Sequence, residues 1–295
     1  IGSLPDSQSQ LGRVNKYTAY ALLGKVLLYQ DKFNEAASAL DNVIGVYSLV
    51  SDYGSQFLRF GENGPESVFE IQYSNQSNWY DWGCAQCSEG NYAIIMNGPR
   101  GWSGPEYAQG WSFNVPTAEF YNSFEEGDSR RDATVLDIEA FATSTGSNYT
   151  EGYDHTGYFN NKYIPRAGES GGQTELNYLT NFRIIRYSDV LLMAAEAYNR
   201  GGIDDGLAQE FLNQVRRRAF GNDDYDISES GTALTDAIWE ERKFELSLEG
   251  HRFFDLVRTG RASSLIPGFV EGKHEVFPIP QQEIDISGLI QNAGY

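Results

Sequence analysis

The chain has 295 residues and a formal net charge of -19, from 41 acidic and 22 basic side chains. Such an acidic surface disfavours nucleic acids and anionic membranes as partners and suits uncharged or cationic ligands. No apolar run approaches the roughly 20 residues that cross a bilayer, and aromatic residues, at 14% of the chain, are more numerous than a core alone requires.

The first predicted element is a helical hairpin within residues 1–50. Its apolar positions follow the tetratricopeptide pattern of paired antiparallel helices, with residues 31–34 as the turn; they are Tyr20, Leu23, Gly24, Leu27, Ala36, Leu40 and Val43. A second hairpin runs from Tyr187 to about Ala219, with Gly201 and Gly202 at its turn. Because lone hairpins cannot cover their own apolar faces, we expect the two to pack on each other, on a helix around Trp239 and on helices outside this chain.

Residues 51–182, between the hairpins, differ in kind, since they are rich in Gly, Asn, Ser and aromatic residues. Alternation from Phe69 to Tyr73 predicts a short strand, and Pro116 to about Phe124 predicts a helix capped by Thr117. We expect the remainder to be loop. Connections of this length are uncommon unless they carry function, so this excursion is the expected seat of activity.

The excursion holds four of the five tryptophans between Ser74 and Phe113, interleaved with amide side chains. A flat aromatic face covers the C–H surface of a sugar ring, while Asn, Gln and Arg hydrogen-bond its hydroxyls. The pattern therefore predicts a carbohydrate platform, with these candidate ligand contacts: Trp79, Tyr80, Trp82, Trp102, Tyr107, Asn78, Asn97 and Arg100.

The alternative is that these aromatic side chains form a small core that supports a long loop, and for Trp111 we favour this alternative because it lies beside Phe113 and Pro116. The two cysteines, Cys84 and Cys87, lie in the same stretch. In an exported protein a local disulfide that braces the loop is the best interpretation of this spacing; half of a zinc site and a redox motif are the alternatives.

The run from Trp239 to Gly260 is dense in charge, but its spacing is that of a packed helix. Leu234, Ile238, Arg242 and Leu246 recur at every fourth position, so we expect Arg242 to be partly buried on an apolar face. A buried Arg needs partners, and Glu245, Glu249 and Asp255 are the candidates. We expect a structural ion-pair network here, with Gly250 at the end of the helix.

Catalytic and metal motifs are missing from the sequence. No carboxylate pair is marked by its spacing for glycoside hydrolysis, and no nucleophile, zinc or phosphate motif occurs. We therefore predict no enzyme and no catalytic residues. Residues 222–226 could bind calcium through oxygen ligands, but they lack the pattern of an EF-hand loop, so a solvated loop is the prediction. Residues 128–132 are predicted to be a surface turn with ion pairs.

Several segments resemble, in order, a known family of surface proteins. The signature includes the Trp239–Gly260 run, Phe277–Asp285 and Gln291–Tyr295 at the C-terminal end, preceded by residues 4–26, 111–117, 127–131 and 186–197. Together these segments resemble the SusD/RagB family of outer-membrane glycan-binding lipoproteins. Members carry a signal peptide, a lipid-modified cysteine and further helices before the point matched by Leu4, so we expect this chain to be the C-terminal portion.

The resemblance implies a mainly helical, SusD-like fold, an α-α superhelix of tetratricopeptide-like hairpins with a loop-rich excursion and minor β structure. We expect a single domain over residues 1–295, with a hairpin (1–50), the excursion (51–182), the second hairpin and signature helix (183–260) and a tail (261–295). The family role is non-catalytic glycan binding for a SusC-like, TonB-dependent transporter, on the outside of the outer membrane and attached only by a lipid anchor. The alternatives are a helical-repeat adaptor for proteins and a glycoside hydrolase.

Overall fold

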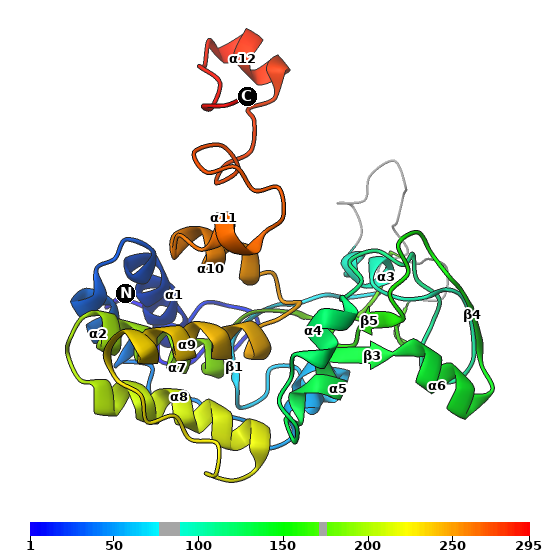
Figure 1. Cartoon of the computed structure of the whole chain (residues 1–295), viewed down its shortest axis with the longest axis horizontal. Helices are drawn as coiled ribbons and strands as arrows, with labels where there is room; N and C mark the ends of the chain where they lie inside the picture. The colour runs from blue at the N-terminus through cyan, green and yellow to red at the C-terminus, as the bar shows by residue number, and fades with distance from the viewer. Residues whose placement is uncertain (77–88, 171–175) are drawn as a thin grey trace. The chain divides into compact units, whose positions relative to one another are not determined.

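The computed structural model describes residues 1–76, 89–170 and 176–295. It divides into two compact units, Ile1–Leu248 and Glu249–Tyr295. Within the described residues, the larger unit is mainly helical and its strands form two-stranded sheets only, as Figure 1 shows. The predicted mainly helical class is therefore confirmed.

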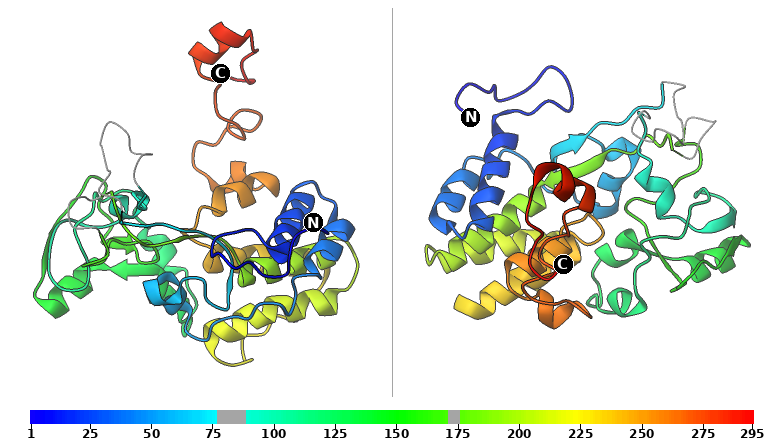
Figure 2. Two further views of the ribbon diagram at one scale, coloured as in Figure 1. Left: turned by 180° about the vertical axis from the view of Figure 1, so that it is seen from behind. Right: turned by 90° about the horizontal axis from the view of Figure 1, so that it is seen from above.

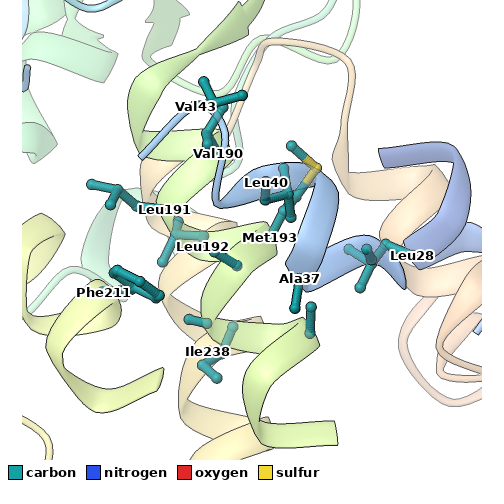
Figure 3. Close-up of a cluster of buried hydrophobic side chains, with 14 of the residues drawn as sticks. Leu28, Ala37, Leu40, Val43, Val190, Leu191, Leu192, Met193, Phe211 and Ile238 are labelled. Atoms are coloured by element: carbon teal, nitrogen blue, oxygen red, sulfur yellow. The ribbon is translucent and has the colours of Figure 1, made fainter. Parts of the chain in front are cut away.

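Five helices of the larger unit pack into one layer around a shared apolar core. They are α1 (Lys16–Tyr29), α2 (Phe33–Leu40), α7 (Tyr187–Arg200), α8 (Asp205–Phe220) and α9 (Gly231–Glu245). Figure 3 shows α7 at the centre, with Val190 beside Val43 and Met193 beside Leu40 of α2, while Leu191 lies toward Phe211 of α8. Almost every residue of α7 is buried, so this helix joins the two hairpins.

Both predicted hairpins are confirmed, and local side chains define where their helices begin. Asn15 caps α1 by accepting a hydrogen bond from the Thr18 amide at 2.8 Å, and Asp204 caps α8 by accepting from the Leu207 amide at 3.0 Å. These are the side-chain acceptors that helix N-termini prefer. Gly221, in the left-handed conformation with φ of 76°, ends α8.

The excursion contains more regular structure than a loop, which corrects the expectation from the sequence. Its elements are η1 (Tyr53–Phe57), η2 (Arg59–Gly61), β1 (Ser67–Ile71), α3 (Ala93–Met96), β2 (Arg100–Ser103), α4 (Ala118–Asn122), α5 (Arg130–Thr134), β3 (Val135–Asp137), α6 (Ile138–Thr145), β4 (Asn148–Thr150), β5 (Tyr158–Asn160) and β6 (Phe182–Arg186). Figure 2 shows, from two sides, the elements from α3 to β5 gathered at the opposite end of the unit from α1 and α2. Apart from β1 and α4, the elements of the excursion were missed by the sequence pattern, because they are short and lack a repeating apolar period.

Two predicted elements of the excursion are confirmed. The predicted strand is β1, which begins two residues before Phe69 and pairs antiparallel with β6. The predicted helix is α4, whose Thr117 cap accepts a hydrogen bond from the Phe120 amide at 3.1 Å. The other antiparallel pairs are β2 with β4 and β3 with β5.

A network of buried ion pairs connects the excursion to the helical layer. The Arg130 side chain, 0% exposed, binds Asp128 at 2.7 Å and Glu245 at 3.1 Å. The Glu245 carboxylate also binds Arg186 at 2.9 Å and Arg218 at 2.6 Å. The expectation of a surface turn at residues 128–132 is wrong for Arg130, because its guanidinium points inward; Arg131 alone forms the exposed pair, with Asp132.

Charges in this network hold one another ionised. Burial acts to raise the pKa of the Glu245 carboxyl, but Arg218, Arg186 and Arg130 lower that pKa well below its ordinary value. Burial acts conversely to lower the pKa of the Arg130 guanidinium, and its carboxylate neighbours raise it well above the usual range. Opposite charges at hydrogen-bonding distance therefore dominate over desolvation.

The C-terminal end of α9 provides a second attachment for the excursion. The backbone carbonyl oxygen of Glu245 accepts hydrogen bonds from the Tyr53 hydroxyl at 2.8 Å, from Lys162 Nζ at 3.0 Å and from Arg186 Nη2 at 3.0 Å. The last carbonyls of a helix have no partner within it. Here the Glu245 carbonyl receives its partners from the side chains of three separate segments.

The predicted burial of Arg242 is confirmed, with a partner that the sequence analysis missed. Its Nη1 atom donates to Asp189 Oδ1 of α7 at 2.7 Å, and both side chains are buried. The expectation that Gly250 ends the helix is wrong, because α9 ends at Glu245 with Leu246 as its C-cap. Leu248, with φ of 62°, and Gly250, with φ of 87°, belong to the turn that follows.

The smaller unit, Glu249–Tyr295, contains α10 (Arg252–Arg258), α11 (Ala262–Leu265) and α12 (Gln281–Ser287). The Gln291 side chain forms two hydrogen bonds with the backbone of Ile279. Its Oε1 atom accepts from the backbone N–H of Ile279 and its Nε2 atom donates to the backbone carbonyl of Ile279, each at 2.8 Å. The two C-terminal signature segments are thus hydrogen-bonded to each other.

Candidate functional site

The structure describes only half of the predicted ligand contacts. Asn78, Trp79, Tyr80 and Trp82 lie outside the described residues, as do both cysteines and their proposed disulfide. The other four predicted contacts, Asn97, Arg100, Trp102 and Tyr107, lie on α3, β2 and the segments that follow them.

Trp102 and Tyr107 pack inside the excursion. Trp102 is 9% exposed, and its ring lies 6.0 Å from that of Tyr107 and 5.8 Å from that of Phe141, centroid to centroid. Burial raises the pKa of the Tyr107 hydroxyl. These contacts, which also involve Ile138 and Phe159, favour the alternative that the two rings form a small supporting core.

Trp111 is partly buried against a second apolar cluster that includes Ile94 and Ile95, which confirms its predicted packing role. Asn97 is buried as well. Its Nδ2 atom donates to the carbonyls of Ala93 and Tyr163, each at 3.1 Å. Asn97 therefore holds α3 in place.

Arg100 is exposed, and it marks a surface that the sequence analysis named only in part. Its Nε atom donates to the Trp111 carbonyl at 2.8 Å, and its guanidinium carbon lies 5.9 Å from the centre of the Phe113 ring. Phe113 is 54% exposed and Tyr153 is 91% exposed. We define the Phe113 platform as Arg100, Ser112, Phe113, Asn114 and Tyr153.

Unusual backbone conformations flank the ring of Phe113. Ser112 and Asn114 both adopt the left-handed conformation, with φ of 57° and 53°. Side chains other than glycine adopt it rarely and at an energetic cost, and such residues gather at functional sites. Two of them on either side of one exposed aromatic residue indicate that this presentation is built into the fold.

Backbone hydrogen bonds fix the segment that carries Phe113. The amides of Trp111, Ser112 and Phe113 donate to the carbonyls of Ile95, Gly98 and Met96, each at 2.8 Å. Gly98 and Gly110 allow this close approach, because a Cβ atom on Gly110 would lie 2.4 Å from the Cα atom of Gly98. The platform therefore rests on rigid backbone packing.

A third loop brings Tyr153 to the same place. A Cβ atom on Gly152 would lie 2.7 Å from Ser112 Cβ, while Ser112 Oγ accepts a hydrogen bond from the Arg100 amide at 3.1 Å. Arg100, Ser112 and Gly152 thus meet. The loop is held further by Thr156, whose hydroxyl donates to the Pro116 carbonyl at 2.7 Å.

The platform offers a ligand two exposed rings, one guanidinium group and the side-chain amide of Asn114. This amide is supported by a 3.3 Å hydrogen bond from Asn114 Nδ2 to Asn97 Oδ1. Rings of this kind bury apolar C–H surface, and the polar groups donate to and accept from hydroxyls. Phe113 and Tyr153 escaped the sequence analysis, since only the backbone shows that they are presented outward.

A cavity of about 210 Å³ lies elsewhere, between residues 7–18 and β1. Two of the polar side chains that line it are hydrogen-bonded within the protein. Thr18 Oγ1 donates to the Val68 carbonyl at 2.9 Å, and Glu70 Oε1 accepts from the Asn63 amide at 3.1 Å. The cavity is the weaker candidate for a sugar, because neither of the aromatic side chains that line it, Tyr47 and Phe69, is exposed.

Across residues 1–76, 89–170 and 176–295, no cluster of three or more His, Cys, Asp or Glu side chains is arranged to hold a metal ion. In the same residues, none of the helices has both the length and the apolar character to cross a membrane.

Comparison with known proteins defines the class. The sequence profile of the SusD family matches residues 136–265. A solved laminarin binding SusD-like protein is 39% identical with a TM-score of 0.89, over 100% of this chain and 66% of its own. Surface glycan-binding protein A from Bacteroides thetaiotaomicron, solved in complex with laminarihexaose, is 32% identical with a TM-score of 0.89, over 99% of this chain and 67% of its own.

The chain therefore belongs to the SusD/RagB family, as the resemblance in the sequence predicted. SusD-like protein P2 of Formosa agariphila is 28% identical over 99% of this chain. The chain spans 62% of the length of that relative and 66% of the length of the laminarin-binding protein.

Proposed function

We propose that this chain takes part in binding an oligosaccharide or polysaccharide at the cell surface, without cleaving it. The observation that carries the proposal is the similarity over the whole chain to a protein described as laminarin binding. The exposed Phe113 platform supports it, because the platform combines the aromatic and polar groups that sugars require. A laminarin-type glucan is the first ligand to test.

In this proposal Phe113 and Tyr153 stack on sugar rings, while Arg100 and Asn114 hydrogen-bond hydroxyl groups. No covalent step is involved. Trp102, Tyr107 and Asn97 act beneath the platform as its support. Asn78, Trp79, Tyr80 and Trp82 stay proposed as further contacts from the neighbouring part of the sequence.

The proposal extends to location and partner through the family. The bound glycan would be delivered to a SusC-like, TonB-dependent transporter for nutrient uptake. The protein would lie on the outer face of the outer membrane, held there by a lipid anchor.

The test is titration of laminarihexaose into the protein by calorimetry. We expect binding by the parent chain and a loss of at least tenfold in affinity, about 1.4 kcal/mol, in Phe113→Ala combined with Tyr153→Ala. Phe60→Ala is a matched control, because Phe60 is 79% exposed and lies on η2, outside the platform. It should change affinity less than twofold.

Two outcomes would contradict the proposal. If the parent binds no member of a panel of neutral glucans, the chain is not a glucan-binding unit. If chromatography of the incubated oligosaccharide shows shorter products, the protein is an enzyme and the non-catalytic role is wrong.

A further inference from the structure

The sequence segment that carries the Phe113 platform is strongly acidic. Residues 89–170 contain twelve Asp and Glu residues but only five Arg and Lys residues. Three of the five cations lie near carboxylates: Arg130 and Arg131 form ion pairs, and Arg166 lies 3.8 Å from Glu106. The other two, Lys162 and Arg100, donate to backbone carbonyls. Within the described residues, Arg100 of the platform forms no ion pair.

Two carboxylates flank the most exposed ring of the platform. Glu151 and Asp154 lie on either side of Tyr153 in sequence, and both are exposed. In the part of the chain that the structure describes, neither forms an ion pair. Because Gly152 packs against Ser112, the loop that carries these two carboxylates lies at the edge of the platform.

One of these two carboxylates, Glu151, already affects the pKa of a neighbouring group. Burial raises the pKa of the Tyr149 hydroxyl, and the charges of Glu139, Glu151 and Asp137 raise it further. The negative carboxylates disfavour the negatively charged, deprotonated form of the Tyr149 hydroxyl, because like charges repel. A sulfate or carboxylate group on a ligand at this edge would meet the same negative potential.

We infer that the Phe113 platform is selective for neutral glycans, and that Glu151 and Asp154 exclude chains that carry sulfate or carboxylate groups. This inference rests on the proposed function. Arg100 does not reverse the selection, because its Nε donor and one side of its guanidinium are engaged by Trp111 and Phe113. Each repulsion in water is weak, but repulsions add along a glycan that is charged at several sugar units.

The experiment compares laminarihexaose with the same hexasaccharide after sulfation, by calorimetry on the parent chain. At low ionic strength we expect the neutral ligand to bind at least about tenfold more tightly. The ratio of the two affinities should become smaller in about 0.5 M salt, since salt screens exposed charges. A sulfated ligand that binds as tightly as the neutral one at low salt would overturn the inference.

The variant Glu151→Gln/Asp154→Asn identifies the residues responsible. In this variant the affinity for the sulfated ligand should rise to within about threefold of the affinity for the neutral ligand. The affinity for the neutral ligand should stay nearly unchanged. Asp223→Asn/Asp224→Asn is the control, because it removes the same net charge from an exposed loop elsewhere. If both double variants change the ratio equally, net charge and not the platform edge governs selection.

The failures of the two proposals are distinguishable. A parent chain that binds neither hexasaccharide contradicts the proposed function and the inference together. A parent chain that binds only the sulfated ligand leaves glycan binding in place and overturns the inference alone.

Discussion

The buried ion network and the Phe113 platform are two charged or polar regions of one unit that are built in opposite ways. In the network, Arg130 and Glu245 are fully buried and each is paired several times. In the platform, Phe113 and Tyr153 are exposed and their positions depend on backbone hydrogen bonds and close glycine contacts. The region densest in charge is therefore scaffold, while the surface suited to a ligand contains a single charged side chain, Arg100, among its five residues.

The largest expected effect comes from breaking the network at Arg130. Arg130→Met leaves buried carboxylates on Asp128, Glu241 and Glu245 with one fewer cation, and removal of one partner of a buried pair costs about 3–5 kcal/mol. We expect a loss of that size in the free energy of unfolding, measured in urea.

Arg131→Met is the matched control for this variant. Its side chain is 43% exposed and pairs with the exposed Asp132, so the loss should stay below about 1 kcal/mol. Equal losses in the two variants would show that the network does not stabilise the fold in the way described.

A second prediction concerns acid. Because the folded-state pKa of Glu245 lies well below its ordinary value, its contribution to stability is fully present above the unfolded-state pKa of about 4.3. It is lost as the pH falls below that value toward the folded pKa. Urea unfolding of the parent and of Glu245→Gln from pH 7 to pH 3 should show the variant less stable at pH 7 and the difference narrowing in acid. A constant difference would contradict this account.

A smaller effect is expected where the platform meets its support. Gly110→Ala places a Cβ atom 2.4 Å from Gly98 Cα, so the segment must shift. Strain of this kind costs about 1–3 kcal/mol, and laminarihexaose binding should weaken with it. Gly206→Ala, where the near contact is the end of the Asp204 side chain at 3.2 Å, should change the free energy of unfolding by less than about 1 kcal/mol. If Gly110→Ala changed neither the free energy of unfolding nor laminarihexaose binding, the platform would not depend on this contact.

The helical layer could be predicted from the sequence because its apolar positions repeat locally. Leu234, Ile238 and Arg242 share one face of α9 at every fourth position, and Gly201 and Gly202 mark the turn of the second hairpin. The partners of the buried charges could not be predicted in this way. Asp189 lies 53 residues from Arg242, and Glu241 lies 111 residues from Arg130, so only the fold brings them together.

The platform was predictable as a region but not as a set of residues. Aromatic and amide richness indicated the excursion, yet composition does not distinguish a buried ring such as Trp102 from an exposed one such as Tyr153. For Phe113, outward presentation goes with the left-handed backbone at Ser112 and Asn114, which no periodic pattern encodes. The tryptophan positions that lie outside the described residues stay predictions.

The Glu245 carbonyl, which accepts hydrogen bonds from Tyr53, Lys162 and Arg186, has a consequence for tolerated changes in chain length. A backbone oxygen is present whatever side chain stands at position 245, so substitution leaves it in place. Deletion of one residue within α9 would instead move it by about 1.5 Å along the axis and turn it by about 100°. The register of this helix, more than the identity of its last residue, determines whether the excursion is anchored.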